Sequence, residues 1–248
     1  MPYYTTVAEA RNFTGTATAE VSDTALNQLI RRATYEIDKR TARTWQRPVT
    51  ETDLLYDGDG TDLLLLKHCD IQSLSAISIR ETSGDSTATY TTVTATKVAV
   101  YSEGYLVLYT DAEVTAFTAG PNTAKLTYTR GATYKNAINA TGGIDATTAT
   151  ITVDSTTGFP SYGTIIIEDE WIDYTGVSST TFTGCVRGQY GTTGATHADD
   201  SVVYEAAPPD IRLICHLLLA NYIDKDNERE RKVDEMIKRI AWHNPSLA

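Results

Sequence analysis

Residues 56–68 read YDGDGTDLLLLKH, and this stretch decides how the first half of the chain is interpreted. Its two Asp-Gly pairs favour a tight turn, because glycine accepts the positive φ that primed hairpin turns require. Apolar, strand-like residues lie on both sides of the pairs. We therefore predict a β-hairpin between strands at 54–56 and 63–66. The residues expected to form its turn are Asp57, Gly58, Asp59 and Gly60.

The same stretch does not fit the two ligand-binding loops that such glycines can also form. Counted from Asp57, the sixth position of a calcium loop is Asp62 and the twelfth is His68, whereas an EF-hand needs glycine and glutamate there. A phosphate loop is excluded as well, since neither Gly-Lys-Ser nor Gly-Lys-Thr follows. The stretch predicts a turn and no metal site.

Upstream of the turn, apolar residues recur at intervals of three and four, which is typical of a helix with one buried face. Ser22 offers an N-cap, and the predicted helix runs over about 22–44. Downstream, residues 52–130 contain β-rich runs, and the turn Ser102-Glu103-Gly104 joins two of them. This half of the chain therefore predicts one helix followed by a β region.

Residues 137–205 have a different composition, rich in Thr, Ser and Gly, with short strand-like runs separated by turns. They contain nine acidic residues and a single basic one, Arg187, so that they carry −8 of the net charge of −11. We predict a small, acidic, all-β domain inserted into the first. A chain with this charge also disfavours direct DNA binding, which needs a basic surface.

The helical pattern returns at Pro208-Pro209 and predicts helices over about 209–223 and 227–242. The first is apolar around most of its circumference, which indicates either a deep core or a subunit interface. The residues expected in that core or interface are Leu26, Leu29, Ile30, Ile211, Ile214, Leu217, Leu218 and Tyr222. The second keeps helical anchor spacing, suited to an arm that docks in a groove, at Val233, Met236, Ile237, Ile240 and Trp242.

These patterns together predict an α+β protein. Residues 1–136 and 206–248 would form one discontinuous domain, and residues 137–205 the inserted domain. An apolar content of 41% and a charged content of 21% agree with a soluble globular chain, and no apolar stretch is long enough to span a membrane.

Signals for catalysis, metals and cofactors are weak. The three cysteines are far apart and lack the spacing of a zinc site. Glu168, Glu170 and Asp173 surround Trp171 and could be read as a glycosidase pair, but an acidic strand face is the simpler interpretation. We therefore predict neither an enzyme nor a cofactor or metal site.

Four patterns follow one another in a characteristic order: a capped helix, the Asp-Gly turn, a strand reading I-x-S-L-S-A-I-S-I, and a helix beginning P-P-D-I. The residues that carry them are Asp23, Leu26, Leu29, Ile30, Ala33, Ile37 and Asp38, then Tyr56, Asp57, Gly58, Gly60, Thr61, Leu63 or Leu64 and Leu66, then Ile71, Ser73, Leu74, Ile77 and Ile79, and finally Pro209, Asp210 and Ile211. In this order they resemble the head–tail connector (adaptor) proteins of tailed viruses. The resemblance covers about 3–136 and 206–242, and departs from the family at Lys67, where a proline is usual. The inserted segment is similar to a small β-module that recurs in virion proteins.

The resemblance implies assembly rather than turnover. Adaptors of this family form a ring, commonly of twelve subunits, beneath the portal protein, where they extend the DNA channel and offer a platform for a neck or tail completion protein. It implies a protein made in the host cytoplasm and incorporated at the head–tail junction of the virion, past which DNA slides without specific binding. A membrane is not expected as a partner.

Two other functions stay open from the sequence. The acidic β-domain could be a tail or surface binding module that recognises a host surface or a glycan. A carbohydrate-active enzyme built on Glu168, Glu170 and Asp173 is the third.

Overall fold

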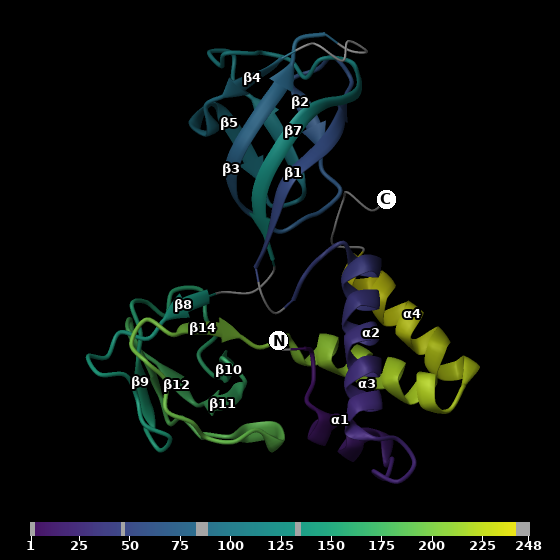
Figure 1. The fold of residues 1–248 in the computed structure, drawn as a ribbon, viewed down its shortest axis with the longest axis vertical. Coiled ribbons are helices and arrows are strands. Elements are labelled where there is room, and N and C mark those ends of the chain that lie inside the picture. Colours follow the sequence, from purple (N-terminus) through teal and green to yellow (C-terminus); the bar gives the residue numbers. More distant parts are fainter. Residues whose placement is uncertain (1–2, 46–47, 83–88, 132–134, 242–248) are drawn as a thin grey trace. The chain divides into compact units, whose positions relative to one another are not determined.

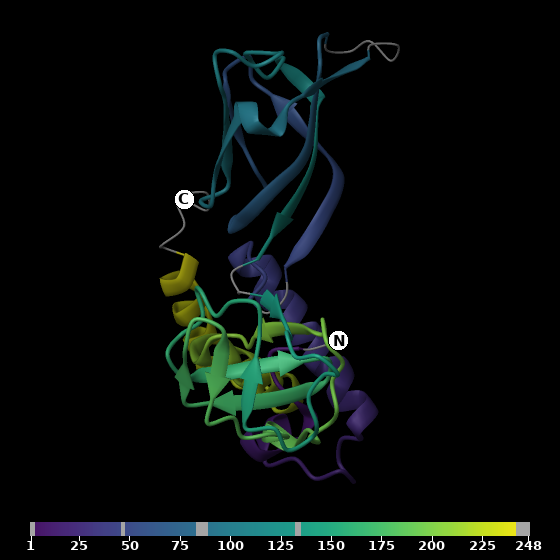
Figure 2. The same ribbon diagram turned by 90° about the vertical axis from the view of Figure 1, so that its left-hand side faces the viewer.

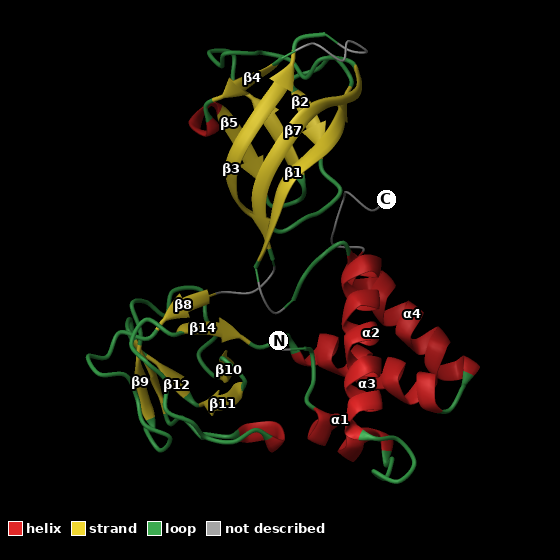
Figure 3. Cartoon of the chain, viewed as in Figure 1, coloured by secondary structure: helices red, strands yellow, loops and turns green. Residues whose placement is uncertain are grey.

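The computed structural model describes residues 3–45, 48–82, 89–131 and 135–241. Helices and antiparallel sheets are both present in these residues, so that the predicted α+β class is confirmed (Figures 1 and 3). The chain divides into two compact units. One comprises Met1–Thr41, Trp45–Arg47 and Thr133–Arg239, and the core of the other is formed by Pro48–Ala132. This division differs from the one expected from the sequence: the helices of the predicted discontinuous domain share a unit with the predicted insert, while the β region of that domain, at 48–132, forms the second unit.

The helical part of the first unit contains four helices among the described residues. They are α1 (Val7–Thr14), α2 (Asp23–Thr41), α3 (Pro209–Ile223) and α4 (Asn227–Ala241). The last three agree with the predicted ranges, whereas α1 was missed. It is short, but its ends are well specified: the Thr6 side chain accepts a hydrogen bond from the Glu9 amide, and Gly15 closes it at φ 69°.

The second unit is built from two sheets that enclose one apolar core (Figure 2). The first sheet has the order β1-β7-β3-β4, with β1 at Val49–Gly58, β7 at Gly120–Arg130, β3 at Ile71–Arg80 and β4 at Tyr90–Val93. The second has the order β2-β6-β5, with β2 at Leu63–Leu65, β6 at Tyr105–Leu108 and β5 at Val98–Tyr101, the last preceded by the short helix η1 at Ala95–Lys97. The predicted turn at 102–104 joins β5 and β6, which pair as an antiparallel hairpin.

The hairpin predicted at Asp57, Gly58, Asp59 and Gly60 is wrong. β1 pairs with β7 and β2 pairs with β6, so the Asp-Gly stretch connects two sheets instead of two paired strands. Asp57 and Gly58 still belong to β1, and the Asp57 carboxylate accepts a hydrogen bond from the amide of Asn122. The Asp-Gly pairs do mark the end of a strand. The partner of that strand, however, is β7, whose paired residues lie 62 to 81 positions further along the chain.

The β-module of the first unit has two small sheets and a core of its own. The order β11-β10-β14-β8 joins β11 (Glu170–Tyr174), β10 (Gly163–Ile167), β14 (Val202–Glu205) and β8 (Lys135–Ala137). The order β12-β13-β9 joins β12 (Gly176–Val177), β13 (Thr181–Thr183) and β9 (Thr150–Thr152), and a short helix η2 lies at Gln189–Gly191. The core residues all fall between Ile138 and Val203.

The sequence predicted that the acidic residues at 168–173 lie on one strand, but the structure divides them between a turn and a strand. This stretch contains the turn of the β10–β11 hairpin, in which Ile167 pairs with Glu170 and Glu168 adopts φ 53°. Glu168 and Asp169 are therefore exposed at the turn, and Glu170 faces inward at the start of β11.

Candidate functional site

The residues predicted for the core or a subunit interface lie in the helical core of the single chain. Leu26, Ile30, Ile211, Ile214 and Leu218 are almost completely inaccessible, and Leu217 is buried too. Leu29 and Tyr222 are half-buried, and the Tyr222 hydroxyl donates a hydrogen bond to Glu36. α3 is broadly apolar because α1 and α2 pack against it, so its breadth requires no second subunit.

The predicted docking arm lies in α4, and its apolar stripe faces its own chain. Val233 and Ile237 are buried, and Met236 and Ile240 are half-buried. An ion pair between Asp234 of α4 and Arg40 of α2 holds the two helices together. Trp242, the remaining residue of the predicted arm, lies outside the described residues. Any partner that binds α4 in this arrangement meets its charged side.

A polar network missed by the sequence analysis joins α1 to α3. His216 accepts or donates a hydrogen bond at 2.7 Å to the hydroxyl of Thr5, and its ring stacks on Phe13. Glu9 lies 3.9 Å from the His216 ring and pairs with Arg212. Burial holds the pKa of His216 below its ordinary value; Glu9 opposes this shift, and Arg212 adds to it.

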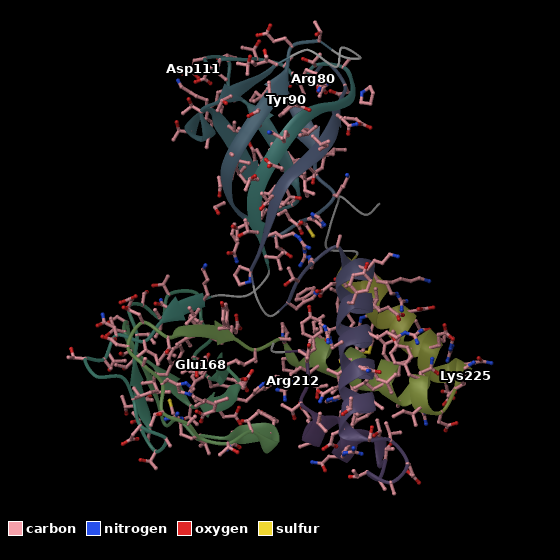
Figure 4. The ribbon with its side chains drawn as sticks, in the orientation of Figure 1. Arg80, Tyr90, Asp111, Glu168, Arg212 and Lys225 are labelled. Carbon is pink, nitrogen blue, oxygen red and sulfur yellow. The ribbon has the colours of Figure 1, made fainter. Side chains whose placement is uncertain are left out.

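Arg212 also joins the helices to the β-module (Figure 4). Its guanidinium lies 4.2 Å from the ring centroid of Tyr190 and 5.0 Å from that of Trp171. The hydroxyl of Thr6 donates to the carbonyl of Tyr190 in the same region. The module is thus packed onto α1 and α3 by a cation held between aromatic rings.

Glu170, one of the three carboxylates considered for catalysis, lies at the centre of a buried cluster. Its side chain is 1% exposed and accepts hydrogen bonds from the guanidinium of Arg187, the amides of Gly188 and Ala195, and the ring of His197. Burial alone would raise its pKa, but these donors outweigh it and hold the pKa of Glu170 below its usual range. The carboxylate is fully occupied in holding the loop at 187–197.

The other two carboxylates do not form a catalytic pair with it. The Glu168 side chain is 64% exposed and lies 3.1 Å from Nδ1 of His197, on the opposite edge of the ring from Glu170. Asp173 accepts hydrogen bonds from the hydroxyls of Thr164 in β10 and Tyr190 in η2. A glycosidase needs one protonated and one ionised carboxyl group facing a substrate. The three carboxylates instead serve as hydrogen-bond acceptors within the module.

A groove of about 700 Å³ crosses the module beside this cluster. Most of its walls are small or hydroxyl-bearing, as at Gly143, Thr150 and Thr196. Asp145 and His197 also line it, but both side chains are hydrogen-bonded within the module, Asp145 to Thr147 and Thr148 and His197 to Glu168 and Glu170.

Within the described ranges no group of three or more histidine, cysteine or acidic side chains could hold a metal ion. The cysteines are buried, and burial raises the pKa of Cys185 and Cys215, which leaves both thiols protonated near neutral pH. The groove can therefore offer hydrogen bonds but no evident nucleophile.

No helix in the described part of the chain is long and apolar enough to cross a membrane. No family model matches the sequence, and no curated protein matches it either.

Two solved structures show limited similarity to the chain. One, described as the neck of an empty gene transfer agent (GTA) particle computed with C6 symmetry, has 21% identity and a TM-score of 0.35, and the match covers 50% of this chain and 64% of that one. The other, described as the virion of a native GTA particle, has 17% identity and a TM-score of 0.43, and covers 94% of this chain and 87% of that one. Both scores are too low to establish a shared fold.

Proposed function

We propose that this protein is a structural virion component, a head–tail adaptor that forms a ring under the portal. In this role it extends the DNA channel and provides the platform for a neck or tail completion protein. The protein is not an enzyme in this proposal. It acts by presenting surfaces to the portal, to the next component and to further copies of itself, twelve being the number that the family resemblance implies.

The observation that carries the proposal is the order of the four sequence patterns along the chain. Three of the four coincide with an element that has a structural reason for the pattern, and the second, the Asp-Gly stretch, connects β1 and β2 in different sheets. The first supplies the buried face of α2, the third is β3 in the interior of its sheet, and the last begins α3 with Pro209 at its first turn.

The charge of the chain agrees with a channel protein that does not bind DNA specifically. A net charge of −11 leaves no excess of cations to neutralise phosphates, so the duplex would slide past without being held. Contact with the portal through α4 would use its exposed charged residues, among them Arg231, Glu235 and Lys238, because the apolar stripe is already covered.

The test is positional. Antibodies against the full chain should label the head–tail junction of intact particles of the virus that encodes it, as seen in electron micrographs. A charge-reversal variant of α4, Arg231→Glu with Lys238→Glu, should reduce co-sedimentation of the purified protein with portal rings. The control is the matched double reversal on α2, Arg31→Glu with Lys39→Glu, at two exposed positions. Label at the tail tip or on the capsid surface, or absence from particles, would overturn the adaptor proposal.

The groove in the β-module supports a second candidate function, in which the module binds a glycan or another ligand on a host surface. Its hydroxyl-bearing walls suit a polyhydroxylated ligand better than an apolar one. The full-length variant Thr150→Arg would block the groove. Cell binding by the wild type that this variant loses would favour the second function, and no binding by the wild type would remove it.

A further inference from the structure

The sheet β2-β6-β5 of the second unit is apolar on both of its faces. Leu64, Leu106, Leu108 and Val98 point inward and are buried in the core. The side chains on the other face lie in two cross-strand rows, Leu63–Val107–Ala99 and Leu65–Tyr105–Tyr101. No charged residue occupies any of these six outer positions, and Leu65 is 66% exposed, Tyr101 39% and Leu63 38%.

The neighbouring sheet of the same unit provides an internal comparison. Its outward positions are mainly polar, as in the row formed by Thr92, Ser78 and Lys125. A sheet with one face in water normally alternates in this way. The apolar outer face of β2-β6-β5 is therefore not a general property of this unit, and a contiguous exposed apolar patch indicates an interaction surface.

The composition of this face is that of a protein interface. The rings of Tyr101 and Tyr105 stack with their centroids 4.3 Å apart and their planes inclined by 12°. Tyrosine supplies a large, rigid contact area at low cost in conformational entropy and is enriched in protein interfaces. Beside the two rings, Leu65 has the largest exposed fraction among the described leucines of this unit.

Charged residues lie at the ends of the two outer strands, and their arrangement identifies the partner. β2 is preceded by Asp62 and followed at once by Leu66 and Lys67, whereas β5 is preceded by Lys97 and followed by the turn that contains Glu103. β2 and β5 run in the same direction, because each is antiparallel to β6. β2 therefore runs from an acidic to a basic end and β5 from a basic to an acidic end. Both lysines also have a partner in their own chain, since Lys97 pairs with Asp111 and Lys67 donates a hydrogen bond to the carbonyl of Leu55.

We propose that a second copy of this chain covers this face, with the strands of the two sheets antiparallel across a two-fold axis. In that arrangement β2 lies over β2 of the other copy, so that Asp62 of each copy meets Lys67 of the other. β5 likewise lies over its counterpart, and Lys97 meets Glu103.

The other two-fold orientation, with parallel strands, would place β2 over β5 of the second copy and would also bring unlike end charges together. The packing of the two rows favours the antiparallel orientation, because it places Tyr101 over Ala99 and Tyr105 over Val107 of the other copy, whereas the parallel one places Tyr105 over Tyr105. Packed sheets lie about 10 Å apart, a distance that the tyrosine and leucine side chains can fill.

The contact is small. Six side chains form its centre, compared with the roughly 20–30 residues a side of a standard interface. The pair is therefore a weak dimer of the free protein, formed at high concentration. It is separate from the proposed ring and does not depend on the adaptor function.

The first experiment measures the oligomeric state of the full chain by sedimentation equilibrium over a wide range of concentrations. The wild type should show a concentration-dependent monomer–dimer equilibrium. Leu65→Glu should weaken dimerisation at least about tenfold, since it places a carboxylate in the apolar centre of each half. Thr92→Glu is the matched control, an exposed outward position on the edge strand β4, and should leave the equilibrium unchanged. A wild type that stays monomeric throughout, or a dimer that Leu65→Glu leaves intact, would overturn the proposal.

The second experiment tests the two-fold arrangement by exchanging charges. Asp62→Lys and Lys67→Asp should each weaken dimerisation, because each brings like charges together in both halves of the pair. The double variant Asp62→Lys with Lys67→Asp restores opposite charges in the antiparallel overlay and should recover the wild-type dissociation constant within about threefold. A double variant that remains as weak as the single ones would rule out this orientation of the dimer.

Discussion

Arg212 of α3 lies over the ring of Tyr190 in the β-module, 4.2 Å from its centroid. The same guanidinium lies 5.0 Å from the centroid of Trp171 and forms an ion pair with Glu9 of α1. This side chain of α3 thus links α1 to two aromatic residues of the β-module. A module of this kind is free to move on its connections unless contacts with the rest of the unit fix it. Arg212 provides two such contacts, with Tyr190 and Trp171, and the hydroxyl of Thr6 provides a third.

Replacing Arg212 by alanine should therefore loosen the module and lower stability. The variant loses two cation–π contacts and leaves Glu9, 19% exposed, without its cation. We expect the free energy of unfolding to fall by about 2 kcal/mol, measured by urea denaturation. Hydrogen exchange should also become faster at residues 189–192. Arg231→Ala is the control, because Arg231 is 71% exposed and its ion pair contributes at most about 0.5 kcal/mol. Equal losses for both variants would show that Arg212 does not hold the module.

Glu170→Gln should destabilise the β-module without affecting the shape of its backbone. The substituted amide keeps one acceptor but brings an NH₂ group toward Arg187 and leaves that guanidinium, 7% exposed, without a countercharge. The expected loss is about 3 kcal/mol in urea denaturation, as when one partner of a buried ion pair is removed. Glu168→Gln, at a side chain that is 64% exposed, should change stability by less than about 0.5 kcal/mol. A Glu170→Gln variant as stable as the wild type would show that the ion pair with Arg187 does not hold the module together.

Three of the four α-helices in the described residues could be predicted from the sequence because their signals are local. The spacing of Leu26, Ile30 and Ile37 identifies the buried face of α2, and Pro209 marks the start of α3. The prediction failed where distant residues decide. The Asp-Gly stretch has the dipeptide preference of a hairpin, but β1 finds its partner in β7, and no local pattern reports that pairing.

The sites of the molecule were harder to predict for the same reason. Glu170 is satisfied by residues 17 to 27 positions further along the chain, on a loop whose path the sequence does not reveal. α3 has the composition of a subunit interface, and only the position of α1, a helix missed in the sequence, shows that it is covered within one chain. The apolar outer face of β2-β6-β5 could have been found from the alternation rule, since leucines occupy both parities of residues 63–66.

The free energy of unfolding should fall in mild acid, and His216 should contribute to the fall. Its pKa is lower in the folded chain than the ordinary value of 6.5. Below pH 6.5 the unfolded chain therefore takes up a proton that the folded chain does not, so stability decreases until the pH reaches the folded pKa. His68, whose pKa is also lowered by burial and by Arg130, acts in the same direction.

The contribution of His216 can be isolated with His216→Gln, which keeps a polar group near Thr5 but does not titrate. Urea midpoints measured between about pH 7 and pH 5 should decline less steeply in this variant than in the wild type. Carboxylates titrate in both proteins and cancel in the comparison. Parallel curves for the two proteins would show that His216 is protonated equally in the folded and unfolded chains.

The two glycines of the Asp-Gly stretch should respond differently to substitution, because they are required for different reasons. A Cβ on Gly58 would lie 2.2 Å from the carbonyl oxygen of Thr118, so Gly58→Ala forces β1 away from the adjoining backbone. Gly60 has φ +89°, but a Cβ there would meet only Ala119 at 3.7 Å. We expect Gly58→Ala to cost about 3 kcal/mol by overpacking, and Gly60→Ala about 1 kcal/mol from its backbone conformation.

Asparagine separates the two causes, since it tolerates positive φ better than alanine but is larger. Gly60→Asn should be more stable than Gly60→Ala, whereas Gly58→Asn should be less stable than Gly58→Ala, with urea denaturation as the measurement for all four. If asparagine rescued both positions, both glycines would act as turn residues, and the pairing of β1 with β7 near Gly58 would be in doubt. If it rescued only Gly60, the requirement at Gly58 is space, set by a strand end that packs closely against residues 117–123.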